Sequence, residues 1–235
     1  MILDIDNSTS VQAFVKKVTE EWFNPDTMYT DLKASGKTNS SHFWGITDHM
    51  VDIISEYLNQ TSEEFLNIWN QKCSKNTAMI MGYHCTRHSN KMIFMKNGIV
   101  PLSENTIEIN ENQNVDAEEM WEYRSKKTPG PWFLLSYKFA KSQSNSFCRH
   151  GPEILLACAG QQTNVDSTKS IPLIIHCEIP YSILHEKHYF AFCILRAYFN
   201  IIDPEPEDNL NFDGYSIDLK GTVLDPQYIV KVEEL

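Results

Sequence analysis

The sequence has no long apolar run. No stretch reaches the roughly 18 consecutive apolar residues that a membrane-spanning helix needs, so we expect no membrane partner. Residues 1–11 carry acids and no apolar core, which does not predict a secretory signal. The Gly-rich turn that holds a dinucleotide in doubly wound parallel sheets is also missing, so that fold is not expected.

Closely spaced cysteine pairs are absent as well. The six cysteines are scattered without a CxxC or CxxH pattern, whereas structural zinc sites usually draw on such pairs. A chain of 235 residues can bury a core without disulfide bonds. We therefore expect no metal site and no disulfide framework. Reduced cysteines predict a cytoplasmic protein, or one delivered to the cytosol of a host cell as an effector or toxin.

Positive charge is scarce. The 20 Lys and Arg residues are outnumbered by 31 Asp and Glu, which gives a net charge of −11. Such a surface repels phosphate backbones, so generic nucleic-acid binding is not expected. Hydrophobic residues make up 42% and charged residues 22% of the chain, which indicates a globular protein with a true core.

The first third of the chain has the periodicity of helices. Apolar residues recur at helical spacing from residue 11 to residue 22 and from residue 50 to residue 58. A capping box that starts at Thr61 predicts a further helix. The polar stretch 26–41 is expected to be a loop. Residues 1–75 are thus expected to form a helical N-terminal region.

Short apolar runs bounded by turn residues dominate the remainder of the chain, which we expect to form a second domain of residues 76–235. Expected strands are residues 78–84, 132–135, 153–159, 173–179, 189–195 and 228–232, and expected helices are residues 89–97 and 116–127. Many strands that follow early helices predict an α+β fold. All strands are expected beyond Met79.

The densest chemical signal lies at the end of the first of these runs. The run ends in His84-Cys85-Thr86, and the helix that follows is closed by Asn97-Gly98. This order places a His side chain and free backbone groups together at the end of the strand, on one rim of a possible binding site. Backbone N–H and C=O groups suit a planar amide, and a His suits a ribose hydroxyl. The alternative is a plain strand end with a surface His.

These residues resemble the ADP-ribosyltransferase superfamily, in the His-Tyr-Glu branch that includes the poly-ADP-ribose polymerases. There the first strand ends in hydrophobic-His-Gly-Thr/Ser, and a helix ending in a Gly-hydrophobic step follows; residues 83–86 and 97–99 match this pattern. Cys85 stands where the family has Gly, a position that acts through its backbone. The resemblance implies NAD as the substrate. It also implies a split β-sheet core, with two small packed sheets around a cleft.

A second element of the family is a Gly-x-Tyr-Phe strand start, followed by a helix that leads to a Tyr stacking on nicotinamide. Residues 130–133 resemble the strand start, and residues 144–148 resemble the later stretch, with Phe147 in place of the Tyr. Phe147 or Tyr137 is then the expected stacking ring, since a phenyl face stacks as well as a phenol. Alternatively, both rings are core residues.

A third element is a late strand with the pattern Glu-Tyr-Ile-Val. Residues 225–230 resemble it, with Gln227 in place of the Glu. An amide can bond a ribose, but it cannot stabilise an oxocarbenium cation by charge or act as a base. Chain elongation is therefore not expected. Transfer of a single unit could continue with a nucleophilic acceptor or with another acid, of which Asp225, Glu233 and Glu153 are candidates.

The expected function is transfer of one ADP-ribose from NAD to a protein or other macromolecule, with release of nicotinamide. The resemblance implies that His84 holds the adenosine-side ribose and that the backbone of Cys85 and Thr86 holds the nicotinamide amide. Gln227 would bind the other ribose. Two alternatives remain open, a catalytically inactive module that binds NAD, ADP-ribose or a protein, and an NAD glycohydrolase.

Overall fold

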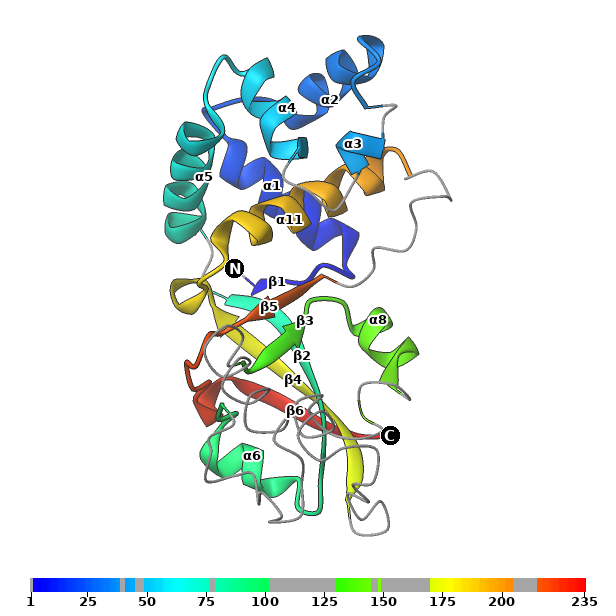
Figure 1. Cartoon of the computed structure of the whole chain (residues 1–235), viewed down its shortest axis with the longest axis vertical. Helices are drawn as coiled ribbons and strands as arrows, with labels where there is room; N and C mark the ends of the chain where they lie inside the picture. Colours follow the sequence, from blue (N-terminus) through cyan, green and yellow to red (C-terminus); the bar gives the residue numbers. More distant parts are fainter. Residues whose placement is uncertain are drawn as a thin grey trace, which may run out of the picture. The chain divides into compact units, whose positions relative to one another are not determined.

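The computed structural model describes residues 2–38, 41–44, 49–76, 79–101, 130–144, 148, 170–204 and 215–235. Helices and a mostly antiparallel sheet are both present, which confirms an α+β protein. The chain divides into two compact units (Figure 1). None of the described helices has the length and apolar character needed to span a membrane.

The helical unit contains residues 1–80, 180–182 and 186–215. Its helices are α1 (Ser8–Thr19), α2 (Pro25–Ala34), α3 (Ser41–Trp44), α4 (His49–Tyr57), α5 (Ser62–Asn76) and α11 (Lys187–Ile202). α1 packs against α5 and α11, and its apolar stripe from Val11 to Val18 is buried. The expected capping box is confirmed, because Glu64 accepts a bond of 2.8 Å from the Thr61 N–H and returns its own N–H to the Thr61 hydroxyl.

Residues 26–34 were expected to be a loop, and this prediction is wrong. The Asn24 side chain caps α2, Pro25 occupies its first turn, and Met28, Tyr29 and Leu32 are buried. The helix ends at Ser35, Gly36 and Lys37, so the expected loop began about ten residues too early. Few of the helix's residues are apolar, and its pattern resembles that of a polar loop.

Residues 189–195 were expected to be a strand and instead lie within α11. The run is apolar almost without interruption, and such a run has no period that separates a strand from a helix. Most of α11 from Phe190 to Phe199 is buried. Burial on all sides explains the missing polar face. α11 also brings a late part of the sequence into the helical unit, although the sequence suggested that residues 76–235 form one domain.

The second unit contains residues 81–179, 183–185 and 216–235. Its strands are β2 (Met79–His88, which starts in the helical unit), β3 (Trp132–Leu134), β4 (Ile171–Pro180), β5 (Ser216–Asp218) and β6 (Ile229–Glu234). The order is β5-β3-β2-β4-β6. β3 pairs antiparallel with β2 and β5, and β4 pairs antiparallel with β6, with Trp132 opposite Asp218 and Ile174 opposite Glu233. The strands expected near residues 78–84, 132–135, 173–179 and 228–232 are confirmed.

Two expectations about the sheet do not hold among the described residues. A short strand β1 (Ile2–Leu3) pairs in parallel with the start of β2, so the strands do not all lie beyond Met79. The described strands also join in one sheet of six, not in two sheets. Two apolar residues were too short a run to predict β1. The strand expected at 153–159 and the helix expected at 116–127 lie outside the described residues.

Two short helices and one turn complete the described part of this unit. They are α6 (Met92–Asn97), α8 (Tyr137–Ser142) and the 3₁₀ turn η5 (Pro226–Tyr228); a further 3₁₀ turn, η3 (Tyr181–Ile183), follows β4. The Ser136 side chain caps α8 by accepting from the Phe139 N–H. Gly98 ends α6 with a φ of 76°, which confirms the stop that Asn97-Gly98 predicts.

Candidate functional site

His84 lies on β2, and its ring is fixed by the neighbouring strand. Its Nδ1 is 2.8 Å from the carbonyl oxygen of Trp132, and its ring lies 5.5 Å from that of Phe133. A carbonyl only accepts, so Nδ1 carries the proton. Burial lowers the pKa of His84, and the Trp132 carbonyl opposes this shift. A neutral ring with Nδ1 protonated presents Nε2 as a hydrogen-bond acceptor, which suits a hydroxyl group.

The residues that follow His84 belong to the same strand. Cys85 is partly buried and packs against the core beside Tyr83, and Thr86 is 5% exposed. Successive side chains of a strand point to opposite faces of the sheet. The Cys85 and His84 side chains therefore lie on opposite faces, and a direct Cys–His pair is excluded.

A second junction joins the end of α6 to the segment before β6. The Ile99 N–H donates to the Leu224 carbonyl at 2.9 Å, and the Leu224 N–H returns a bond of 3.0 Å to Ile99. A Cβ on Gly98 would lie 2.1 Å from the Leu224 carbonyl oxygen. Three residues beyond Leu224, Gln227 is exposed on η5, which packs against α6. Asp225, one of the rival acids, is also exposed.

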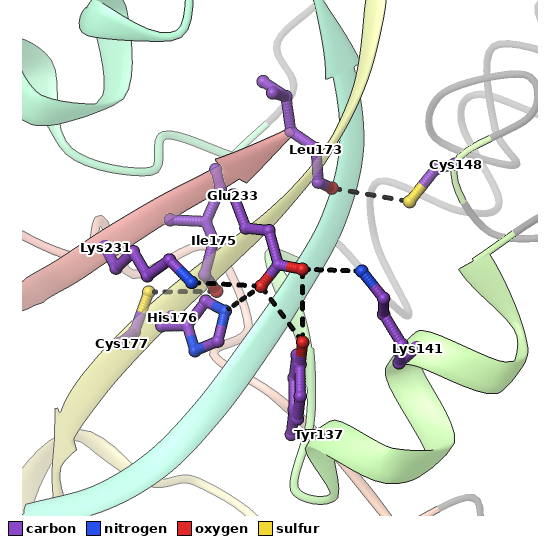
Figure 2. A network of polar contacts seen from close by, with 9 residues as sticks. All are labelled: Tyr137, Lys141, Cys148, Leu173, Ile175, His176, Cys177, Lys231 and Glu233. Carbon is purple, nitrogen blue, oxygen red and sulfur yellow. Dashed lines mark hydrogen bonds and ion pairs between the residues drawn. The ribbon is translucent and has the colours of Figure 1, made fainter. Parts of the chain in front are cut away.

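The rival acid Glu233 lies at the centre of a polar network (Figure 2). Its carboxylate accepts from Lys141 at 2.6 Å and from the Tyr137 hydroxyl at 3.1 Å. His176 Nε2 lies 3.0 Å from it and Lys231 Nζ 3.3 Å. We call Tyr137, Lys141, His176, Lys231 and Glu233 the Glu233 network; it ties α8 to β4 and β6.

These donors hold Glu233 as an anion. The hydrogen bond from Lys141 is the largest cause, and with the other donors it lowers the pKa of Glu233 to about 2 although burial acts in the opposite direction. The Glu233 side chain is 14% exposed. A carboxylate with so low a pKa is a poor proton acceptor at neutral pH, but it is a permanent negative charge.

The depressed pKa of Glu233 predicts an acid-sensitive stability. The network should contribute fully above a pH of about 4.5, the ordinary pKa of a Glu, and lose its contribution as the pH falls toward 2. Glu233→Gln should therefore lower the free energy of unfolding by about 1–3 kcal/mol at pH 7. Denaturant unfolding at several pH values measures this difference, which should shrink toward pH 2.

Glu234→Gln is the matched control, because Glu234 pairs with Lys91 at 2.7 Å in an ion pair whose side chains are about half exposed. Such a pair contributes little, about 0–1 kcal/mol. Equal losses in the two variants, or a Glu233→Gln loss that persists at pH 2, would contradict the ionic role of Glu233.

The structure joins some of the expected site residues and separates others. Tyr137 lies with Glu233, and its ring is 5.5 Å from Tyr83. Tyr83 and His84 are adjacent on β2, so Tyr137 lies on the opposite face from the His84 side chain. Gln227 precedes β6, which β2 and β4 separate from β3 in the sheet order. Phe147 and Glu153 lie outside the described residues.

Sequence reasoning missed the partners of Glu233. His176, Lys141 and Lys231 were not singled out as site residues. One signal was available, because Glu233 directly follows the expected strand 228–232 and lies two residues after Lys231, so that both share a face if the strand continues, as β6 does. Their partner His176, opposite Lys231 in the register, could be found only from the strand pairing.

Across the described ranges, no group of three or more His, Cys, Asp or Glu residues is arranged to hold a metal ion. No protein-family model, curated protein or solved structure matches the chain. The fold and the site define an α+β protein in which the Trp132 carbonyl fixes the ring of a neutral His84. A function can be inferred only from the chemistry and geometry of these residues.

Proposed function

We propose that this protein transfers one ADP-ribose unit from NAD to a protein acceptor and releases nicotinamide. One observation carries the proposal: hydrogen bonds link the first of the three segments that resemble ADP-ribosyltransferase motifs to the second segment and to the residue before the third, although the segments span residues 83–230. His84 is bonded to Trp132 of the second segment. The end of the first segment is bonded at Ile99 to Leu224, next to the third.

In this proposal the neutral His84 accepts a hydrogen bond at Nε2 from a hydroxyl of the adenosine-side ribose. The backbone of Cys85 and Thr86 binds the carboxamide of nicotinamide. Phe147 or Tyr137 supplies the ring that stacks on nicotinamide. The position of Tyr137 on the face opposite the His84 side chain disfavours Tyr137, because one NAD cannot pass through the sheet.

The chemistry is a substitution at the anomeric carbon of the ribose attached to nicotinamide. The C–N bond to nicotinamide breaks and its electron pair leaves with the ring, so that positive charge develops on the sugar. A nucleophile of the acceptor then bonds to that carbon and loses a proton. Gln227 contributes a hydrogen bond to this ribose without charge. Positioning of NAD and acceptor therefore supplies most of the rate enhancement.

The direct test is incubation of the protein with NAD labelled in its adenosine part, together with cell lysate. The proposal expects labelled protein and free nicotinamide in equal amounts. Free ADP-ribose without labelled protein would indicate NAD hydrolysis in its place. Unchanged NAD would overturn catalysis.

His84→Ala tests the anchor of the proposed NAD site. The variant should weaken NAD binding by about 1–3 kcal/mol, or roughly 5- to 150-fold, because a ribose hydroxyl loses its buried partner. Isothermal titration calorimetry measures the dissociation constant. The control is His185→Ala, whose ring is exposed and bonded to Thr222. Equal NAD affinity in His84→Ala and wild type would remove His84 from the site.

A specific observation favours a second candidate, an NAD-binding module without catalysis. Gln227 replaces the expected acid, and the carboxylate of Glu233 is occupied by donors from Lys141, Lys231, His176 and Tyr137. A chain that binds NAD by calorimetry but neither hydrolyses nor transfers it would support this candidate.

A further inference from the structure

An open cleft lies where the chain passes from α1 to α2 in the helical unit. It has a volume of about 510 Å³, and all of its lining residues belong to the stretch 16–26. Sites for small molecules have volumes of roughly 300–1,000 Å³. None of the residues proposed to bind NAD lines this cleft, so it is a separate candidate for ligand binding.

Two aromatic rings line the cleft. Trp22 and Phe23 are both partly exposed, their ring centroids are 5.0 Å apart, and their ring planes meet at 76°. Phe65, which is fully buried, packs against both rings, with centroids 5.0 Å and 6.4 Å away. The face of an aromatic ring is electronegative and attracts a cation within about 6 Å of its centroid. Two ring faces that stand nearly at right angles can therefore contact one cation together.

Carboxylates outnumber ammonium groups along the cleft. Glu20, Glu21 and Asp26 line it, whereas Lys16 is the one basic residue that does so. The Lys16 ammonium lies 3.2 Å from the Asp26 carboxylate, which offsets its charge. Glu20 pairs with Lys17, which is not among the lining residues. A lining with surplus negative charge attracts a cation and repels a phosphate group.

Glu21 carries the carboxylate that remains for a ligand. Among the described residues its side chain forms no ion pair and no hydrogen bond. It is exposed and has a φ of 62°, a conformation that is uncommon for residues other than Gly. This turn ends α1, because the next two N–H groups both bond to the Thr19 carbonyl, at 3.0 and 3.1 Å. A further ammonium group, that of Lys72, bonds to the backbone carbonyl of Glu20 at 2.8 Å and not to Glu21.

We propose that this cleft binds a small molecule that carries a quaternary ammonium group, such as choline. The ammonium group contacts the ring faces of Trp22 and Phe23, and the Glu21 carboxylate balances its charge. A quaternary ammonium has no N–H, so it requires no hydrogen-bond acceptor, and its methyl groups fit the apolar ring faces. Binding involves no NAD, so this proposal does not rest on the transferase function.

The test is a titration of the full-length protein, labelled with 5-fluorotryptophan, and followed by ¹⁹F NMR at constant ionic strength. The sequence has five Trp, and the resonance of Trp22 is the one that Trp22→Phe lacks. Choline should shift this resonance in a saturable way. Its neutral isostere 3,3-dimethylbutan-1-ol should bind about 2- to 30-fold more weakly, because it has the same shape without the charge.

Three results would overturn the proposal. They are a Trp22 resonance that does not move at millimolar choline, equal affinity for choline and its neutral isostere, and tighter binding of phosphocholine than of choline. The last result would mean that the ligand is a lipid headgroup or another phosphate ester. We expect phosphocholine to bind more weakly, because the carboxylates of the cleft repel its phosphate.

Two variants, each with a matched control, locate the binding energy. Phe23→Leu keeps an apolar side chain without a ring face and should weaken choline binding by about 2- to 30-fold, whereas Phe94→Leu, in a partly buried ring on α6, should not. Glu21→Gln should weaken it by about 1.5- to 5-fold, and Glu63→Gln, at an exposed acid on α5, should leave it unchanged. Equal affinities in Phe23→Leu and Phe94→Leu would contradict the site. The comparison of choline with its isostere in the wild type decides the question even if Phe23→Leu does not fold.

Discussion

Gly98→Ala is expected to lower the free energy of unfolding by about 3–5 kcal/mol, the largest stability effect that we expect of a single substitution here. Gly98 has a φ of 76° and a ψ of −164°, a conformation that is essentially restricted to Gly. A Cβ at this position would lie 2.1 Å from the Leu224 carbonyl oxygen and 3.1 Å from the Pro226 nitrogen. Both are backbone atoms and cannot rotate away. Strain and overpacking each cost about 1–3 kcal/mol, and here they add.

Gly36→Ala separates these two costs. Gly36 has almost the same φ, 75°, but no atom lies within 4 Å of a Cβ built there. Only the cost of the left-handed conformation should remain, about 1–2 kcal/mol. Urea unfolding of both variants measures the difference. Equal losses would mean that the bonds between Ile99 and Leu224 do not fix the backbone around Gly98.

Gln227→Glu is expected to raise the rate of NAD turnover by about 100- to 1000-fold if Gln227 contacts the ribose. A carboxylate there would stabilise the positive charge that develops on the sugar. One preorganised electrostatic group is worth about 2.7–4 kcal/mol of barrier. Gln227 is exposed on η5, so an added charge has little desolvation cost in the free protein. Release of nicotinamide from NAD, with and without an acceptor, measures the rate.

Gln143→Glu is the matched control, since it adds the same charge at the exposed C-terminal cap of α8. It should leave the turnover of NAD unchanged. If Gln227→Glu is equally neutral in an active protein, the acid lies elsewhere, and Glu233→Gln and Glu153→Gln become the next variants. If the wild type and Gln227→Glu bind NAD and neither consumes it, the non-catalytic module is the correct reading.

Local signals in the sequence predicted the local elements well. The predictions of a capping box at Thr61, a helix stop at Gly98 and a strand near residue 230 were each correct, because each depends on neighbours within a few residues. α11 was misread because an uninterrupted apolar run carries no period. Its helical form follows from burial against α1 and α5, which only the folded chain provides.

The candidate site could be predicted only residue by residue. The sequence singled out His84, but the carbonyl of Trp132, which fixes the tautomer of His84, lies 48 positions away. Glu233 was named as one acid among three, without the four donors that lower its pKa. These partners come from α8, β4 and β6. Which strands pair with one another cannot be predicted from the sequence of any single strand.

The placement of α11 has a practical consequence for anyone who divides this protein. The chain leaves the sheet after β4, adds α11 to the helices, and returns to form β5 and β6. A fragment that begins at residue 76 would carry α11 away from α1 and α5 and expose side chains such as Phe190, Leu195 and Phe199 to water. Such a fragment is expected to aggregate. The helical unit and the second unit therefore cannot be separated by a single cut of the chain, because their segments alternate along the sequence.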